Sequence, residues 1–497
     1  MSRTLNSRMA RMMLPGLKRW ILIILAGIAV IVVGIFLYLG YHPVHVTSML
    51  IRETLETAAD LVPHKRSGFV VIIGGALIVC IAIYRMTLSV VGAYVPNERE
   101  SIPDVLYRKR HLAKGPRVVV IGGGTGLSNL LRGIKMFTNN ITAIVTVGDD
   151  GGSSGRLRQE LGVLPPGDLR NCITALADEE GLVTELFRYR FESGGGLEGH
   201  SFGNLFLTAV CAITNGDMLE ATRVASRVLN SCGQVLPSTL VNFSLVAEMD
   251  DGSVIEGESH ITEAGGRIKT LSLKPAKPKA TPEAIEAIHA ADLIILGPGS
   301  LYTSIIPNLL VEGIPQAIRD SNADKIYVTN VLTQLGETTG YSVGDHVEAI
   351  LSHSATPSNL GYRLMEAVLV NDQTPDFEGK LPADIKPVSL DNDRLRELGV
   401  VVIKRNLLSQ KAIGHHDSDK LAKSIMLWHM RHGRKQPIKK VGTKPSLSAT
   451  GSSTNGKYAA TATAPIAPVV ENEIADEELV AAGLKEPAIK DSNEPKS

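Results

Sequence analysis

The chain has 497 residues, 44% of them hydrophobic and only 4% aromatic, and it carries 51 basic and 51 acidic side chains. This length is enough for several domains with a large core, and a net charge of zero argues against a nucleic-acid binder that relies on a basic surface. The four cysteines include no C-x-x-C spacing, which excludes a disulfide scaffold and is typical of a reduced, cytosolic protein.

Charge is unevenly distributed along the chain. The net charge is +9 over residues 1–117, −14 over 118–400, +10 over 401–463 and −5 over 464–497. Two basic flanks therefore surround an acidic middle segment. An anionic ligand of that segment must be held locally, by backbone N–H groups, helix ends or a metal ion.

Two apolar runs near the N-terminus predict a membrane anchor. The spans are expected at about 20–40 and 69–91, with Arg85 as the one charge in the second. Roughly 20 apolar residues suffice to cross a hydrocarbon layer about 30 Å thick. Basic residues in segment 1–19 and in the linker 93–115 place both ends, and with them the main domain, in the cytoplasm. We expect a two-span hairpin over 20–92 in the cell membrane; a signal peptide and a buried core helix are the alternatives for the two runs.

The first element of the middle segment is a β-branched strand at 117–121. A glycine-rich turn, Gly122-Gly-Gly-Thr-Gly126, follows it, and the apolar spacing predicts a helix over 127–135. This order presents backbone N–H groups and a helix N-terminus to a phosphate, although a merely tight βα turn has the same pattern. Leu127 replaces a glycine of the dinucleotide fingerprint, and the P-loop lysine is absent.

Polar side chains follow the second predicted strand, at 141–147. Asp149 and Asp150 come directly after it, and Ser153 and Ser154 add small hydroxyl donors. Because the ends of parallel strands line one crevice, these residues should face the first glycine loop. Two adjacent carboxylates bind a ribose hydroxyl or Mg²⁺, or they are solvated residues of a polar turn.

Two further segments carry candidate ligand-binding side chains. Asp168, Arg170 and Asn171 open a predicted helix, where Asp168 either caps the helix or contacts a ligand. The glycine-rich stretch 194–204 contains His200 and Asn204. His200 is a base, a hydrogen-bond donor or a plain loop histidine, and Asn204 is a hydrogen-bonding candidate at a helix start.

The other half of the sheet is predicted at 291–296 and 325–329. The first of these strands leads into Gly297-Pro-Gly-Ser300, so Gly299, Ser300 and Thr303 lie at a second helix start, and the other strand ends at Asn330. Between the two halves, residues 239–275 read as an antiparallel insertion with a turn at Asp250-Asp251-Gly252.

Six motifs in this order resemble the YvcK-type gluconeogenesis factors, which are similar in fold to the 2-phospho-L-lactate transferases of deazaflavin biosynthesis. The motifs begin at Val120, Val145, Pro165, His200, Gly297 and Asn330, and the resemblance covers roughly residues 115–410. It implies a Rossmann-like, three-layer α/β domain over 116–412 that binds UDP-sugars, notably UDP-N-acetylglucosamine. It also implies a role in carbon-source-dependent growth, cell shape and envelope homeostasis.

The resemblance assigns roles at the matching positions. The first glycine loop should lie near the diphosphate, Asp149 and Asp150 near the ribose or a metal, and Asn204, Ser300 and Thr303 in the crevice. No cofactor is certain; Mg²⁺ at the two aspartates is the candidate, and a homodimer and a protein partner stay open. The expected ligand-binding set is Gly123, Gly124, Thr125, Gly126, Asp149, Asp150, Ser153, Ser154, Asp168, Arg170, Asn171, His200, Asn204, Gly299, Ser300, Thr303 and Asn330.

The C-terminal part divides into a helix and a tail. Residues 413–436 show an apolar stripe of Leu421, Ile425, Met426 and Trp428 among basic residues, which predicts a helix docked on the main domain or lying at a membrane surface. Residues 437–497 are rich in Ser, Thr, Ala, Pro, Lys and Glu, a composition that predicts disorder.

The sequence thus favours a membrane-anchored, nucleotide-sugar-binding regulator. No nucleophile with an adjacent base is evident, so no reaction is assigned. The alternative is a Mg²⁺-dependent enzyme of the 2-phospho-L-lactate transferase type, in which an aspartate-held ion would neutralise charge on the transferred group. An NAD-linked oxidoreductase is disfavoured by Leu127.

Overall fold

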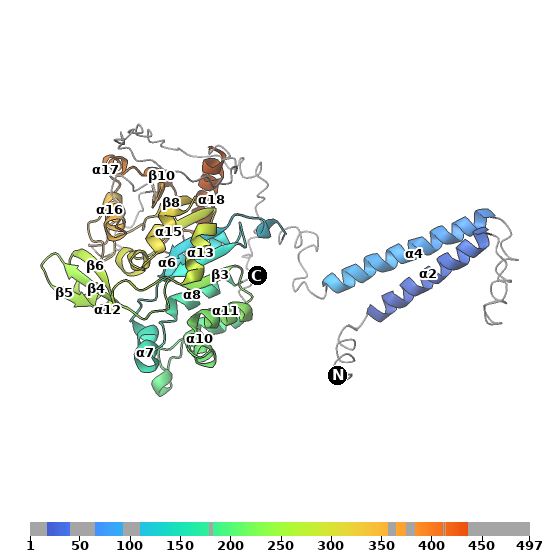
Figure 1. The fold of residues 1–497 in the computed structure, drawn as a ribbon, viewed down its shortest axis with the longest axis horizontal. Helices are drawn as coiled ribbons and strands as arrows, with labels where there is room; N and C mark the ends of the chain where they lie inside the picture. The colour runs from blue at the N-terminus through green and yellow to red at the C-terminus, as the bar shows by residue number, and fades with distance from the viewer. Residues whose placement is uncertain are drawn as a thin grey trace, which may run out of the picture. The chain divides into compact units, whose positions relative to one another are not determined.

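The computed structural model of the chain describes residues 17–39, 65–92, 110–177, 182–355, 364–373, 382, 384–410, 412 and 414–435. These belong to two compact units, Met1–Arg110 and His111–Ser497 (Figure 1). Most of the predicted basic N-terminus and linker, and the whole predicted tail, lie outside the described residues. The domain boundaries given above remain predictions.

The first unit contains two apolar helices, α2 (Leu17–Leu39) and α4 (Lys65–Gly92). They pack antiparallel, because Gly27 of α2 faces Val79 of α4 while Gly34, further along α2, faces Ile72. In α4 the stretch Phe69–Thr87 has a mean hydropathy of 2.4 and is long and apolar enough to cross a membrane. In α2 the apolar stretch Ile21–Ile35 is shorter than that. The expected helical pair is present, and its insertion as two spans remains a proposal.

The second unit is built on a seven-stranded sheet in the order β10-β9-β8-β7-β1-β2-β3, with every neighbouring pair parallel. This confirms the predicted Rossmann-like α/β class. The strands are β1 (Val118–Gly122), β2 (Ile141–Val145), β3 (Gln234–Pro237), β7 (Leu293–Leu296), β8 (Asp324–Val328), β9 (Ala367–Asn371) and β10 (Val401–Arg405).

The central strands consist mainly of Val, Ile and Leu because helices cover both of their faces. Every residue of β1, β2, β7 and β8 is buried, and such near-continuous apolar runs are typical of parallel strands inside a three-layer domain. The sequence located these four strands to within two residues at each end. It assigned no strand at β3, β9 or β10.

Two helical layers enclose the sheet. The first layer contains α6 (Gly124–Ile134), α7 (Gly152–Leu161), α8 (Gly167–Leu176), α9 (Leu182–Arg188), the short turn Gly195–Leu197, α10 (Phe202–Ile213), α11 (Met218–Val228) and α18 (Ser418–Lys435). In this layer α8 and α11 contact β3, while α18 contacts α6 and β8. The second layer comprises α13 (Pro282–Ala290), the π-helical turn η2 (Leu301–Ile305), α14 (Ile306–Leu309), α15 (Ile314–Asp320), α16 (Val343–His353) and α17 (Asn392–Glu397).

The insertion is a three-stranded antiparallel sheet, β5-β4-β6, closed by a short helix. Its elements are β4 (Ser244–Met249), β5 (Val254–Glu256), α12 (Glu258–Ala264) and β6 (Ile268–Lys274). The predicted turn joins β4 to β5. The first strand, β4, begins at Ser244, inside the range predicted for the insertion. Helix α12 has no counterpart in the predicted antiparallel insertion.

Helix α18 packs its apolar stripe against α6. Leu421 and Ile425 are fully buried. The backbone of α18 approaches so closely at Ser418 that a Cβ on Gly133 of α6 would collide with it. Docking on the domain, rather than exposure of the stripe at a membrane surface, is what the described residues show.

Candidate ligand-binding crevice

The two halves of the sheet meet between β1 and β7, where the chain leaves one strand for the first helical layer and the other for the second. The strand-ending loops touch there: the Gly297 N–H donates to the Ile121 carbonyl at 2.8 Å, and a Cβ on Gly126 would lie 2.8 Å from the Pro298 oxygen. In open α/β sheets this switch point is where ligands bind. Both predicted glycine loops therefore border one crevice.

The first loop is shorter than predicted, because α6 begins at Gly124 rather than at Leu127. Gly124 has φ +67°, a conformation that L side chains rarely adopt, and Gly123 before it is extended. Thr125 lies exposed on the first turn. The N–H groups of such a turn lack helical partners and point out of the helix end, where an anion is stabilised.

Asp168 caps this helix rather than its own. The N-cap of α8 is Pro166, so the prediction that Asp168 caps α8 is wrong. Its Oδ2 instead accepts the Gly124 N–H at 2.7 Å. Burial and the charge of Asp149 raise the pKa of Asp168 to about 6, although the Gly124 N–H and Arg170 oppose this. The α6 N-terminus thus already faces one carboxyl group, which is still mostly ionised at pH 7.

Asp149 and Asp150 have different surroundings. Asp150 holds the start of α12: it accepts the N–H groups of Glu258 and Ser259 at 2.8 and 3.0 Å, and the Ser259 hydroxyl at 2.8 Å. Asp149 accepts the Gly151 N–H at 2.9 Å through Oδ1, while its Oδ2 lies beside Gly167. They therefore do not form a pair of equally available carboxylates, and Asp149 is the better placed for a ligand.

Glu258 is a site residue that no sequence motif indicated. Burial and the charges of Asp149 and Asp168 raise its pKa to about 9. The insertion brings it to the crevice, and the prediction of an antiparallel sheet there gave no signal for it. Mg²⁺ usually binds one or two carboxylates together with ligand phosphates and water, so Asp149 with Asp168 or Glu258 fits this ion better than Asp149 with Asp150.

Basic side chains lie on the other side of Asp168. Arg170 is half-buried, and burial and the neighbouring charges of Arg190 and Arg188 lower its pKa. Its buried Nε has no hydrogen-bond partner among the described residues. Asn171, next on the same turn, is half-buried and offers its carbonyl to the Thr174 hydroxyl at 2.9 Å. These guanidinium groups would attract an anion bound near Arg170.

The serine loop and the histidine motif form one buried network. Asn204 Nδ2 donates to Ser153 Oγ at 3.0 Å, and Ser153 Oγ shares a hydrogen bond of 2.9 Å with His200 Nδ1. Burial lowers the pKa of His200, which keeps its imidazole neutral at pH 7. Ser154 packs against Gly167. The structure thus gathers these four predicted residues, while the buried Asn204 Oδ1 lacks a partner among the described residues.

The segment that follows β7 is held by hydrogen bonds to Gln334 and Glu337. Gln334 donates to Ser300 Oγ at 2.9 Å and accepts from Asn330 Nδ2 at 3.1 Å. Glu337 accepts the Thr303 hydroxyl and the Tyr302 N–H, each at 3.1 Å, and burial raises its pKa. The Thr303 hydroxyl is therefore engaged at its own helix start. Gln334 and Glu337 belong to the motif that begins at Asn330, but the sequence assigned them no role.

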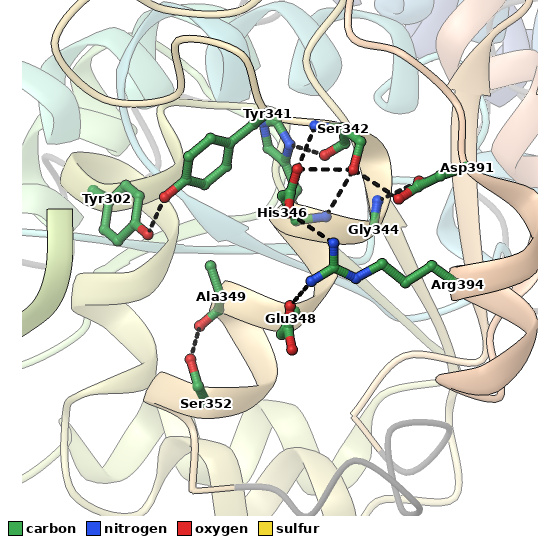
Figure 2. Close-up of polar contacts among 11 residues, drawn as sticks. Tyr302, Tyr341, Ser342, Gly344, His346, Glu348, Ala349, Ser352, Asp391 and Arg394 are labelled. Carbon is green, nitrogen blue, oxygen red and sulfur yellow. Dashed lines mark hydrogen bonds and ion pairs between the residues drawn. The ribbon is translucent and has the colours of Figure 1, made fainter. Parts of the chain in front are cut away.

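A polar network beyond Tyr302 fixes the start of α16 (Figure 2). The hydroxyls of Tyr302 and Tyr341 lie 2.9 Å apart. Ser342 and Asp345 form a capping box, and Asp391 accepts both the Ser342 hydroxyl and the Gly344 N–H at 2.7 Å. Arg394 bonds Asp345 at 2.9 Å. These contacts support the second helical layer rather than offer free groups to a ligand.

Comparison with known proteins agrees with the fold and the motif order. The profile of the family described as 2-phospho-L-lactate transferase CofD matches residues 118–408. The gluconeogenesis factor of Halalkalibacterium halodurans is 47% identical over 63% of this chain and 96% of its own length, and that of Bacillus subtilis is 46% identical over 63% and 98%.

A relative from Nostoc is 49% identical over 84% of this chain and 93% of its own length. A match of that length cannot fit within the second unit alone, so it reaches into the first. A crystal structure of a Bacillus halodurans protein is similar with a TM-score of 0.60 and 47% identity, covering 63% of this chain and all of that one. The chain is a YvcK-type, gluconeogenesis factor member of the CofD family.

Proposed function

We propose that the crevice binds a nucleoside diphosphate sugar, with UDP-N-acetylglucosamine as the leading ligand, and that the protein acts as a regulator that reports on this metabolite. The contact between the β1 and β7 loops carries this proposal. It brings two glycine-rich turns and the N-terminal turn of α6 to one place, where a diphosphate can approach the backbone closely.

The charges of the crevice support a ligand with both anionic and hydroxyl groups. Arg170 with its neighbours suits a phosphate, and Asp149 suits a ribose hydroxyl or a divalent ion. Mg²⁺ would supply charge neutralisation between the carboxyl groups and the diphosphate. The chain's own residues orient the ligand through backbone N–H groups and exclude water on the Ser153 side.

The side chains support binding more than catalysis. The Ser153 hydroxyl and the His200 imidazole share a hydrogen bond, as a nucleophile and its base would. Both residues, however, are at least 95% buried. Asn204 also holds the Ser153 hydroxyl from the other side. A substrate would reach this hydroxyl only after the network opened, so we assign the group to positioning.

We further propose that α2 and α4 anchor the protein in the cell membrane as two spans, with the main unit in the cytoplasm. Apolar side chains such as Leu22, Leu25, Val70 and Leu77 are exposed on the helical pair, and the close glycine contacts suit helices that pack within lipid. After cell lysis we expect the protein in the membrane fraction, resistant to carbonate extraction. Release into the supernatant would contradict the anchor.

The alternative function is transfer of a phospholactate group to a deazaflavin acceptor, as in enzymes of the 2-phospho-L-lactate transferase type. The family match over residues 118–408 is compatible with this alternative. Such catalysis would consist mostly of positioning and of charge neutralisation by Mg²⁺, for which Asp149 is the candidate ligand. A deazaflavin acceptor and an activated phospholactate donor would both have to bind.

One experiment separates the two functions. The full-length protein in detergent micelles is incubated with UDP-N-acetylglucosamine, and separately with the deazaflavin acceptor and its activated phospholactate donor, both with Mg²⁺. We expect saturable binding of the UDP-sugar by calorimetry and no product in either mixture by chromatography. Formation of the phospholactyl product would overturn the regulator function.

A further inference from the structure

A second cluster of metal-binding side chains lies away from the crevice, at the N-terminal ends of the parallel strands. Asp324 is the first residue of β8 and Glu366 directly precedes β9, so both stand at the N-terminal ends of neighbouring parallel strands. His429 and His432 come from the last turns of α18. None of these residues belongs to a motif that led to the proposed function.

The ligand atoms of three of these residues are already gathered. One oxygen from each of Asp324 and Glu366 and one ring nitrogen of His432 lie within 4.8 Å of one another. His432 Nε2 is 3.3 Å from Glu366 Oε2. Two ligands about 2.0 Å from a tetrahedral ion are separated by about 3.3 Å. The spacing of this pair therefore suits a common metal ion.

The geometry around Glu366 distinguishes this cluster from an ordinary ion pair. Glu366 Oε2 is buried and accepts no hydrogen bond from the described residues, although the His432 nitrogen is so close. A buried carboxylate oxygen without a hydrogen bond is costly. An ion between the two groups would satisfy both, since imidazole and carboxylate are zinc ligands.

Asp324, the third proposed ligand, has a hydrogen-bond partner of its own. His429 Nδ1 lies 2.6 Å from Asp324 Oδ2, and Asp324 is 95% buried. Carboxylate ligands are typically held in place by such hydrogen bonds. The ring of His432 stacks on Trp428, with centroids 5.2 Å apart, which restrains the imidazole. The nearby ammonium of Lys325 is bound by the carbonyls of Ser321 and Ala323 at 2.8 and 2.9 Å.

We propose that Asp324, Glu366 and His432 bind a transition-metal ion of the Zn²⁺ class, with His429 positioning Asp324, and that the ion fastens the end of α18 to the sheet. Three protein ligands leave at least one position for water or for a further group. Since α18 leads directly into residues 436–497, the ion would fix the point from which that segment departs.

Zinc binding by the full-length protein tests this proposal. Zn²⁺ is titrated into metal-free protein in detergent micelles, with excess Mg²⁺ present to occupy hard-cation sites, and the heat is measured for the wild type and each variant. His289 is an exposed histidine on α13, so His289→Gln is the matched control. We expect one tight site per chain in the wild type and in this control.

Substitution of a ligand should remove that site. We expect His432→Gln and Glu366→Gln each to weaken the tight site more than 100-fold, and His429→Gln to weaken it by about 10- to 100-fold. Zn²⁺ should raise the melting temperature of the wild type but not of His432→Gln. Because Glu366→Gln keeps the side-chain shape, a folded variant is available even if a histidine variant unfolds.

Two results would overturn the proposal. The first is wild-type protein without a saturable Zn²⁺ site of one ion per chain. The second is a tight site whose affinity is the same in Glu366→Gln, His432→Gln and His289→Gln, because the ion would then bind elsewhere.

Discussion

At the scale of single residues, neighbouring carboxyl groups of the crevice have different tasks. Asp150 is a structural cap for α12, and Asp168 caps α6 from another helix. Asp149 and Glu258 are left as the acidic groups nearest to a ligand or ion, with burial and mutual repulsion raising the pKa of Glu258 to about 9. Neighbouring carboxyl groups in the sequence need not share a role, because some of their oxygens accept hydrogen bonds from backbone N–H groups of distant segments.

Replacing Asp150 should loosen the insertion. Asp150→Ala removes an acceptor for two backbone N–H groups and one hydroxyl at the start of α12, and we expect a loss of about 1–3 kcal/mol in the free energy of unfolding. Thermal unfolding of the full-length protein measures this. Asp251→Ala, in the exposed β4–β5 turn, is the control, and equal effects of the two substitutions would contradict the capping role.

The raised pKa of Glu258 predicts a specific pH dependence. The folded protein keeps this proton up to pH 9, whereas the unfolded chain loses it above about pH 4.5, so the wild type loses stability as pH rises between these values. Glu258→Gln should be more stable than the wild type by at least about 1 kcal/mol at pH 8 and no different at pH 4.

The exposed Glu263, on the same helix, supplies the control for this pH dependence. Glu263→Gln should leave the difference between pH 4 and pH 8 unchanged. Glu258→Gln without any gain at pH 8 would show that Glu258 is ionised there and that the carboxyl cluster is better solvated than the structure indicates. Binding of Mg²⁺ to the wild type should release protons in the same pH range.

At the scale of elements, close helix contacts at glycines define both units. Gly133 admits the start of α18 against α6, and Gly75 admits Ile31 and the backbone of α2 against α4. A side chain at either position must displace a helix, because backbone atoms occupy the space that its Cβ needs. These glycines are therefore sites where a single substitution should detach an element without touching the crevice.

Gly133→Val should detach α18 from the domain. Ser418 and Ala422 stand where the new side chain would lie, so we expect amide hydrogens of α18 to exchange with solvent at least tenfold faster, measured by mass spectrometry. Gly196→Val is the control, because nothing lies within 4 Å of a Cβ there. Unchanged protection of α18 would contradict the packing described here.

The helical pair allows a matched comparison of neighbouring residues. Gly75→Val should separate α2 from α4, while Gly74→Val should not, because a Cβ on Gly74 meets nothing within 4 Å. Faster hydrogen exchange in α2 is expected for the first variant alone. Equal exchange in both variants would mean that the two helices do not pack through this face.

The sequence predicted elements well where a local pattern decides them. The strands β1, β2, β7 and β8 are apolar runs next to glycine turns, and the turn at 250–252 has the composition of a hairpin. The sequence predicted poorly the roles of side chains that depend on contacts with distant parts of the chain. Capping of its own helix was one of two roles open for Asp168, and the structure shows that it caps α6 instead. Glu258 was overlooked because only the folded insertion brings α12 to the β2 loop.

At the scale of the whole molecule, an α/β domain of the CofD family is joined in sequence to an apolar helical pair. The Nostoc relative extends over more of this chain than the relatives that match 63% of it, so its similarity includes part of the first unit. The neutral total charge hides an uneven distribution. The N-terminal flank is basic, which suits a membrane surface, while the domain is acidic and would have to hold an anionic ligand through local groups. Our central claim is that the glycine loops at the switch point do this.

Calorimetric titration of UDP-N-acetylglucosamine into the full-length protein in detergent micelles tests that claim most directly. Thr125→Trp fills the mouth of the first loop from an exposed position, and Thr270→Trp makes the same change at an exposed residue of β6. We predict saturable binding by the wild type and by Thr270→Trp, and a loss of at least 100-fold in affinity for Thr125→Trp. Undiminished affinity in folded Thr125→Trp would remove the glycine loop from the binding site and contradict the account.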